Sequence, residues 1–232
     1  MGLAREVLGA CAEVVGGRAQ CARDAVGATR RLLDAVDLER RALDALPQRD
    51  PFAAGKCSAL GPQFDLQVVE ALRAGGREFA VRPALPGLCL ETGAYARRGS
   101  SPEHRGAALA ARVRARIDDL RDALCRLDEA DAVDDGALWA CGGSGDADGW
   151  GAVESPRGRL YHWARIDAAG CIAAHAVVAP TEWNFHPDGP LVRALRGAAV
   201  SDADEARHAV GWMAALMDPC VAFSVEVEAE DA

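Results

Sequence analysis

The sequence predicts an α+β protein that is mainly α-helical, with a helical bundle followed by a small β meander. Half of its 232 residues are hydrophobic but only 5% are aromatic, a balance that favours closely packed helices over a sandwich or barrel. Apolar residues recur at helical spacing early in the chain, and shorter runs broken by Pro and Gly follow after Asp135. We expect one domain over residues 1–232, mainly helical over 1–135, with the meander, further helices and an Asp-Pro-Cys segment over 136–232.

The first part of the chain contains three shorter helical patterns. Two helices are expected over residues 7–25 and 29–46, where apolar positions recur every three or four residues. A third is expected over 65–72, with Asp65 as its cap and Gly75–Gly76 as its end. A short strand is expected over 78–81.

The clearest helix is expected to begin at the N-cap Ser101 and to run to about residue 130. Its apolar residues step by three and four, which places them on one face, the usual mark of a core-facing helix in a bundle. These residues are Val113, Ile117, Leu120, Leu124 and Leu127.

Later segments indicate the meander and the remaining helices. The glycine-rich residues 141–151 are typical of a mobile turn or linker, and residues 152–180 are expected to form a small meander of strands. Helices are expected over 191–196 and 202–216, and a terminal strand with one wet face from Val221 onwards.

Charge and composition exclude some classes of function. The formal charge of −9 and the pI near 5.1 argue against a nucleic-acid-binding protein, which would show a basic stripe. No apolar run approaches the roughly 20 residues that span a bilayer, and residues 1–21 lack the pattern of a secretory signal, so a cytoplasmic location is expected. The eight cysteines are therefore expected to be mostly buried thiols, and none forms a C-x-x-C pair.

Four segments have unusual residue patterns. Taken singly, each has an ordinary explanation, such as a turn with an ion pair, a loop anchored by a buried tryptophan, or a packed thiol. Their order and separation suggest a common origin. In chain order they are Glu91–Arg97 (ETGAYAR), Glu154–Trp163 (ESPRGRLYHW), Ala179–Pro187 (APTEWNFHP) and Asp218–Cys220 (DPC).

Together these segments resemble the large subunits of nickel–iron hydrogenases, in which E-x-P-R-G-x-L-x-H-W, V-P-T-x-W-N and D-P-C-x-x-C follow one another near the C-terminus. The similarity is strong over residues 150–220, moderate around 91–97 and weak before that. It implies a truncated large-subunit-like fold, one that lacks most of the region before the first cysteine motif.

In that family an iron carrying two cyanides and one carbon monoxide is joined to nickel by four cysteines, two from R-x-C-G-x-C and two from C-x-x-C. Soft thiolates suit both metals. Here Phe223 stands at the last cysteine position, and Leu8 replaces the first cysteine of the N-terminal pair. The resemblance therefore implies Cys220 and Cys11 as metal ligands, which is enough for a transient Fe(CN)2(CO) fragment but not for nickel.

The resemblance also implies how such a fragment would be surrounded. In the family the arginine of E-x-P-R-G and the hydroxyl of P-T donate hydrogen bonds to the cyanides, and these positions correspond to Arg157 and to Thr181 with the preceding Pro180. His162, Trp163 and His186 are expected to have structural roles. Glu226 stands where large subunits carry the histidine of their processing site, so no processing of the tail is expected.

Incomplete cysteine pairs are typical of the hydrogenase expression or formation proteins of the HupK and HoxV type, which resemble large subunits. The resemblance implies a scaffold or carrier, not an enzyme, that works with hydrogenase maturation proteins and the large-subunit precursor. Nucleic acid and membrane insertion are not expected. Two alternatives remain open, a metal-free chaperone that binds maturation partners through a large-subunit-like surface, and a redox enzyme with an altered metal site.

Overall fold

The computed structural model describes residues 26–31, 37–52, 57–98, 108–128, 138–145 and 147–228. The chain divides into two compact units, one of Met1–Leu46 with Val113–Asp134 and the other of Pro47–Arg112 with Asp135–Ala232. A single domain over the whole chain stays a prediction. Helices and a β meander are both present, and helices supply more of the described residues than strands do, which confirms the predicted α+β class.

The described part of the first unit is mainly helical, but the single helix predicted over 29–46 is wrong, because Asp37 has the left-handed conformation, φ 43°, and interrupts it. Residues 26–31 form a helical turn, α3 (Leu38–Asp44) follows, and residues 113–128 are the larger part of α6 (Ala108–Asp128). Arg121 Nη1 lies 3.0 Å from Glu39 Oε2, so an ion pair joins α6 to α3. The start of the predicted helix at Ser101 lies outside the described residues, as does Cys11.

The predicted apolar face of α6 is confirmed in part. Val113, Ile117 and Leu124 are buried, whereas Leu120 is 36% exposed. The stripe is therefore buried at three of its positions and partly exposed at Leu120, and the side chain of Leu127 lies outside the described residues.

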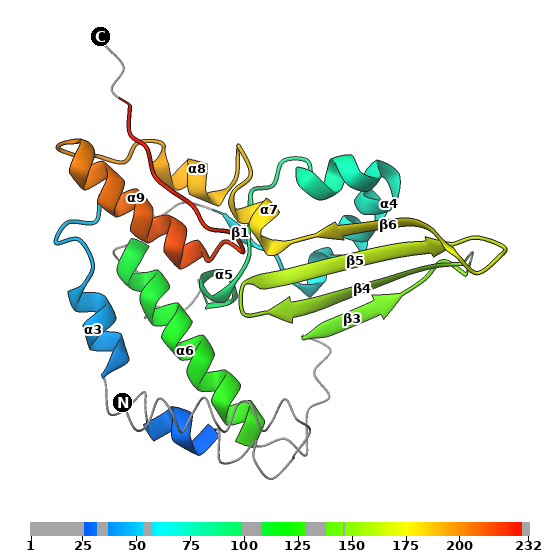
Figure 1. Ribbon diagram of the computed structural model, residues 1–232, viewed down its shortest axis with the longest axis horizontal. Coiled ribbons are helices and arrows are strands. Elements are labelled where there is room, and N and C mark those ends of the chain that lie inside the picture. The colour runs from blue at the N-terminus through cyan, green and yellow to red at the C-terminus, as the bar shows by residue number, and fades with distance from the viewer. Residues whose placement is uncertain are drawn as a thin grey trace. The chain divides into compact units, whose positions relative to one another are not determined.

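The second unit is built on a four-stranded antiparallel meander in the order β3-β4-β5-β6 (Figure 1). The strands are β3 (Trp139–Gly142), β4 (Asp148–Ser155), β5 (Gly158–Ile166) and β6 (Ile172–Val178). The meander begins earlier than predicted, because residues 141–151 contain the end of β3 and the start of β4 instead of a linker. Cross-strand pairing outweighs the weak strand tendency of these glycines.

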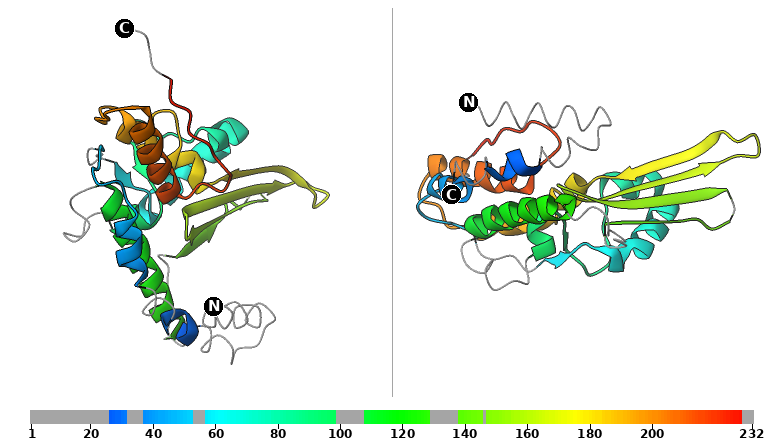
Figure 2. Two further views of the ribbon diagram at one scale, coloured as in Figure 1. Left: turned by 60° about the vertical axis from the view of Figure 1, so that its left-hand side comes forward. Right: turned by 90° about the horizontal axis from the view of Figure 1, so that it is seen from below.

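One helix packs against the sheet. After the short 3-10 helix η1 (Pro62–Phe64), α4 (Asp65–Val81) lies beside β6 and β5, as both views of Figure 2 show. Val68, Val69 and Leu72 of α4 are buried in one cluster with side chains from the sheet and with Trp183. This contact is the hydrophobic core of the second unit.

The predictions for residues 65–81 need correction. The helix does not stop at Gly75–Gly76 but kinks there, with Gly76 at φ 51° and ψ −126°, and residues 78–81 are helical instead of a strand. Gly76 reaches this conformation without steric penalty. Beyond the kink Ala80 is buried and the ring of Phe79 lies edge-on to Trp183 with centroids 6.2 Å apart, so tertiary packing holds the second part of the helix.

The remaining elements lie at one end of the strands of the sheet (Figure 1). A short parallel pair, β1 (Ser58–Ala59) with β2 (Leu90–Glu91), is followed by α5 (Ala94–Arg98). Three helices come after β6, namely α7 (Pro180–Asn184), α8 (Pro190–Leu195) and α9 (Ala203–Met217). Helices near 191–196 and 202–216 are thus confirmed, and the Asp202 carboxylate caps α9 by accepting from the backbone N–H groups of Asp204 and Glu205.

The tail differs from its prediction. Residues 222–228 carry no strand, and Val221 and Phe223 are 67% and 45% exposed. A strand needs a neighbour for its backbone hydrogen bonds, and the alternation of this segment was a weak signal without one. No helix among the described residues is long and apolar enough to cross a membrane.

Candidate functional site

The segments that share the family resemblance meet in the second unit. Thr92, directly after β2, exchanges two hydrogen bonds with Asn184 at the end of α7: its N–H donates to Asn184 Oδ1 at 3.0 Å, and Asn184 Nδ2 donates to its carbonyl at 3.0 Å. Asn184 is only 1% exposed. The buried amide of Asn184 thus bonds to the backbone of Thr92 as a neighbouring strand would, and it joins the ETG and PTEWN segments.

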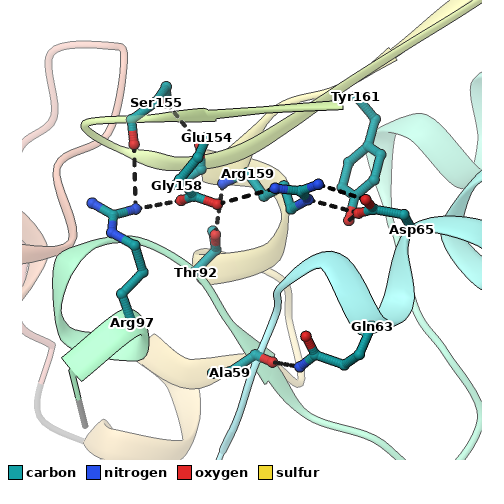
Figure 3. Close-up of polar contacts among 10 residues, drawn as sticks. All are labelled: Ala59, Gln63, Asp65, Thr92, Arg97, Glu154, Ser155, Gly158, Arg159 and Tyr161. Carbon is teal, nitrogen blue, oxygen red and sulfur yellow. Dashed lines mark hydrogen bonds and ion pairs between the residues drawn. The ribbon is translucent and has the colours of Figure 1, made fainter. Parts of the chain in front are cut away.

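The turn between β4 and β5 packs directly against the same Thr92. The backbone N–H of Arg159 donates to Thr92 Oγ1 at 2.8 Å (Figure 3). Gly158 has φ +129°, and a Cβ built there would lie 2.8 Å from the backbone nitrogen of Gly93 and closer still to the Thr92 side chain. Glycine is therefore required for this close approach.

A row of alternating charges supports this junction from the core side (Figure 3). Arg97 Nη1 donates to Glu154 Oε1, and Glu154 Oε2 lies 3.6 Å from Arg159 Nη1. Arg159, whose side chain is fully buried, forms a two-pronged pair with Asp65, and the Tyr161 hydroxyl donates to Asp65 Oδ1 at 3.0 Å. Opposite charges side by side offset the loss of hydration that burial imposes.

Burial changes the pKa values of two residues in this row. Burial raises the pKa of Glu154 above its ordinary value, although Arg97 and Arg159 act in the opposite direction. Burial also raises the pKa of Tyr161, helped by the negative charge of Asp65, so its hydroxyl stays protonated and can donate.

Sequence reasoning missed most of this row. Asp65 is the first residue of α4 and not its cap, which is Phe64, and its carboxylate is used by Arg159 instead. The signal that could have found the pair is the alternation along β5, which places Arg159 on the same buried face as Tyr161 and Trp163. A buried charge needs a buried partner.

Another buried ion pair holds the ETG segment on its other side. Arg112, in the first turns of α6, donates to both carboxylate oxygens of Glu91, and Nη2 lies 3.2 Å from Oε2. The guanidinium also lies 4.2 Å from the ring centroid of Tyr95. The segment is thus fixed by contacts from three directions before any ligand is considered.

The predicted site residues lie at the outer edge of this framework. Thr181 Oγ1 is 3.1 Å from Cys220 Sγ, and the Cys220 N–H donates to the same hydroxyl at 3.4 Å. Pro180 is buried as the first residue of α7, where it positions Thr181. Thr181 and Cys220, 39 residues apart, are therefore neighbours, and Cys220 is exposed.

An ion pair with Asp218 connects Arg157 to the segment that carries Cys220. Its Nε lies 3.6 Å from Asp218 Oδ2, and its side chain is 48% exposed. Asp218 ends α9 in the left-handed conformation, φ 55° and ψ 63°, which redirects the chain so that Cys220 follows two residues later. Arg157 is tied to the segment that carries Cys220, but not to the thiol itself.

The donor set limits what this site can hold. No group of three or more His, Cys, Asp or Glu side chains arranged for a metal ion occurs among the residues that the structure describes. The Thr181 hydroxyl contacts the Cys220 thiol, and the Asp218 carboxylate, two residues before Cys220, pairs with the guanidinium of Arg157. This set fits a metal fragment that brings most of its own ligands and presents hydrogen-bond acceptors.

The other residues of the motifs have structural contacts. Trp163 is buried and donates from Nε1 to Asp148 Oδ2 at 2.9 Å. His186 Nδ1 accepts from the Asp188 N–H at 3.1 Å within its loop, in keeping with a loop-packing role. His162 is exposed on the sheet, with its ring centroid 5.7 Å from that of His175.

Comparison with known proteins gives a consistent picture. The model of the nickel-dependent hydrogenase family matches residues 96–226, more than half of the chain. The hydrogenase expression/formation protein HupK of Rhizobium leguminosarum bv. viciae is 44% identical over 187 residues, which cover 78% of this chain and 50% of that protein. HoxV of Cupriavidus necator, also named a hydrogenase expression/formation protein, is 35% identical over 66% of this chain and 42% of its own length.

The chain spans about half the length of these curated relatives. Among solved structures, the Ni-Fe-Se hydrogenase of D. vulgaris Hildenborough in the reduced state aligns with a TM-score of 0.44 and 24% identity. That alignment covers 60% of this chain and 36% of the hydrogenase chain.

Proposed function

Since this chain belongs to the nickel-dependent hydrogenase family, we propose that it is an accessory protein in the assembly of a nickel–iron hydrogenase and has no hydrogen turnover of its own. The names of its relatives, hydrogenase expression/formation proteins, support the accessory role. Its partners in this proposal are hydrogenase maturation proteins and the precursor of the hydrogenase large subunit.

The cargo that we propose is an Fe(CN)2(CO) fragment bound through the Cys220 thiolate. The observation that carries this proposal is the contact of 3.1 Å between Thr181 Oγ1 and Cys220 Sγ. A hydroxyl beside the ligand sulfur can donate to a cyanide of the bound fragment, and Arg157, linked to Asp218, can supply a second, charge-assisted donor. Cys11 remains a proposed second ligand.

Nickel is not expected to bind with the iron. A nickel–iron bridge needs the thiolates of both cysteine pairs, and Phe223 and Leu8, which replace one cysteine in each pair, offer no donor atoms. A fragment held by few protein bonds can also be passed on, because release breaks few bonds. The same losses that remove the nickel site therefore favour a carrier.

Infrared spectroscopy tests the proposal directly. The full chain, purified anaerobically from cells that make the fragment, is expected to show cyanide and carbon monoxide stretching bands. Cys220→Ser should abolish these bands, because a serine hydroxyl is a poor ligand for low-valent iron. Cys171→Ser, at another exposed cysteine in the turn between β5 and β6, is the matched control and should keep them. Well-folded wild-type protein without such bands would refute the cargo.

A metal-free chaperone is the second candidate, and one observation favours it. Trp139 and Val153, which pair across β3 and β4, are 60% and 43% exposed. An exposed apolar pair formed by the edge strand β3 and its neighbour β4 is suited to protein binding. This candidate predicts that hydrogenase maturation needs the protein but survives Cys220→Ser, whereas Trp139→Ser blocks it. The carrier predicts the opposite pattern.

A further inference from the structure

Two cysteines outside the proposed iron site lie in contact. Cys57 and Cys89 directly precede β1 and β2, and the parallel register pairs Ser58 with Leu90, so the two cysteines are adjacent across the strands. The Ser58 N–H donates to the Cys89 carbonyl at 2.9 Å, and this hydrogen bond holds the two chain segments side by side. Their sulfur atoms are 3.0 Å apart. They are thus a pair, not the isolated core thiols that the sequence suggests.

This sulfur–sulfur distance is not much longer than that of a covalent disulfide bond. A disulfide has a sulfur–sulfur distance of about 2.05 Å, so a shift of roughly half an ångström by each sulfur would join them. Both residues are half-buried, and Cys89 Sγ is 3.9 Å from the Asp188 carbonyl. The backbone pairing already holds the two residues side by side, so closure needs rotation of the side chains and little movement of the strands.

We propose that Cys57 and Cys89 form a reversible disulfide that clamps β1 to β2. The oxidant is a small disulfide RSSR. One cysteine of the pair, as its thiolate, attacks one sulfur of RSSR, forming a mixed disulfide and releasing one RSH. The other cysteine then loses its proton and attacks the sulfur of the first, which forms the Cys57–Cys89 bond and releases a second RSH. Two thiols are oxidised and one RSSR is reduced to two RSH.

The surroundings of Cys57 oppose its ionisation. Burial, followed by the hydrogen bond to Cys89, raises the pKa of Cys57 to about 12, so its thiolate fraction near neutral pH is small. Glu91 adds to the rise and Arg193 opposes it.

The clamp would act on the framework of the candidate site. β2 runs through Glu91 directly into Thr92, the residue that bonds to Asn184 and to the N–H of Arg159. A covalent bond at the start of β2 limits local opening of this segment. The redox state of the cysteine pair is therefore expected to set how firmly the ETG segment is held, whether or not any iron is bound.

The test uses the full chain without cargo, equilibrated in buffers of reduced and oxidised glutathione. Free thiols are then blocked and peptides mapped by mass spectrometry. Under oxidising conditions we expect peptides linked through Cys57 and Cys89, with the loss of two hydrogens, and reversal by dithiothreitol. Cys57→Ser and Cys89→Ser should each abolish the link, and Cys171→Ser should leave it unchanged.

Hydrogen exchange supplies a second readout. Oxidation should slow exchange of the amides at residues 90–93 by on the order of tenfold, since opening of β2 is restrained. Wild-type protein in which both thiols stay alkylatable in oxidised glutathione, or in which either cysteine links to a different one, overturns the proposal. Because these assays contain no iron, their result is independent of the infrared test of the cargo.

Discussion

Among single residues, Arg159 and Thr181 perform two different tasks. Arg159 is fully buried and supports the motif junction through Asp65 and Glu154. Thr181 touches Cys220 and is the group that would meet a ligand there. Substitutions at the first position should therefore change stability, and substitutions at the second should change binding.

Loss of Asp65 is expected to be severe. Asp65→Ala leaves Arg159 charged, buried and without its principal partner, which should lower the free energy of unfolding by about 3–5 kcal/mol. Urea denaturation measures this change. Asp204→Ala, which breaks the exposed pair with Arg207, is the control and should have little effect. Equal effects from both substitutions would contradict the structural role of the buried pair.

Thr181→Val should weaken retention of iron without harming the fold. Valine keeps the shape but removes the hydroxyl that contacts Cys220. Loss of an outer hydrogen-bond donor typically weakens metal binding by about 10- to 100-fold. The iron content after anaerobic gel filtration and the position of the cyanide bands measure the effect. Unchanged iron content and unchanged bands would show that the hydroxyl does not contact the cargo.

At the scale of elements, turns decide how the segments meet. The β4–β5 turn approaches Thr92 closely enough to exclude a side chain at Gly158, and the β3–β4 connection folds onto Asp148. Both turns bring chain segments together that the strands alone would leave apart.

Gly158→Ala should separate the β4–β5 turn from the ETG segment. The added Cβ meets the backbone of Gly93 and the side chain of Thr92, and φ +129° is itself strained for alanine. Together these effects should lower stability by at least about 2 kcal/mol. Gly151→Ala is the matched control in the same sheet, because a Cβ there meets no atom within 4 Å. Thermal unfolding of the two variants compares them.

The meander should weaken in acid through Asp148. Hydrogen bonds from Ser144 and Trp163, together with Arg73, hold the pKa of Asp148 well below its ordinary value of 3.8. The folded state thus prefers the carboxylate, so this stabilisation is present above about pH 4 and is lost as the pH falls through the folded-state pKa. Asp148→Asn should flatten the acid side of a plot of urea midpoint against pH. An unchanged slope would contradict this assignment.

For the whole molecule, the features that could be predicted are those with a signal in the local sequence or in the order of its motifs. Thr181, Cys220 and Arg157 could be predicted together because their motifs keep family order and spacing, and the structure brings Thr181 to Cys220. The pair of Asp65 with Arg159 spans 94 residues, so the alternation along β5 indicates that Arg159 is buried but does not identify its partner. Likewise the helix beyond Gly76 depends on Phe79 packing on Trp183, which no local pattern shows. Local rules thus predict most elements but not their long-range partners.

The whole chain should carry iron without becoming a hydrogenase. Protein purified with its infrared bands intact, then incubated with nickel under reducing conditions, is expected to show no hydrogen oxidation, because Phe223 leaves Cys220 without the thiolate needed for a bridge. Dye reduction under hydrogen measures activity, with an active nickel–iron hydrogenase as the positive control. Appreciable turnover would favour the redox-enzyme alternative.

The exposure of Cys220 has a kinetic consequence for any hand-over of metal. An acceptor thiol can approach a fragment held by an exposed sulfur and bind it before the Cys220 bond breaks, so no free fragment need form. Transfer by this associative route is second order, and its rate should rise in proportion to acceptor concentration. A thiol enclosed in the core would instead release its cargo at a rate that the acceptor could not influence.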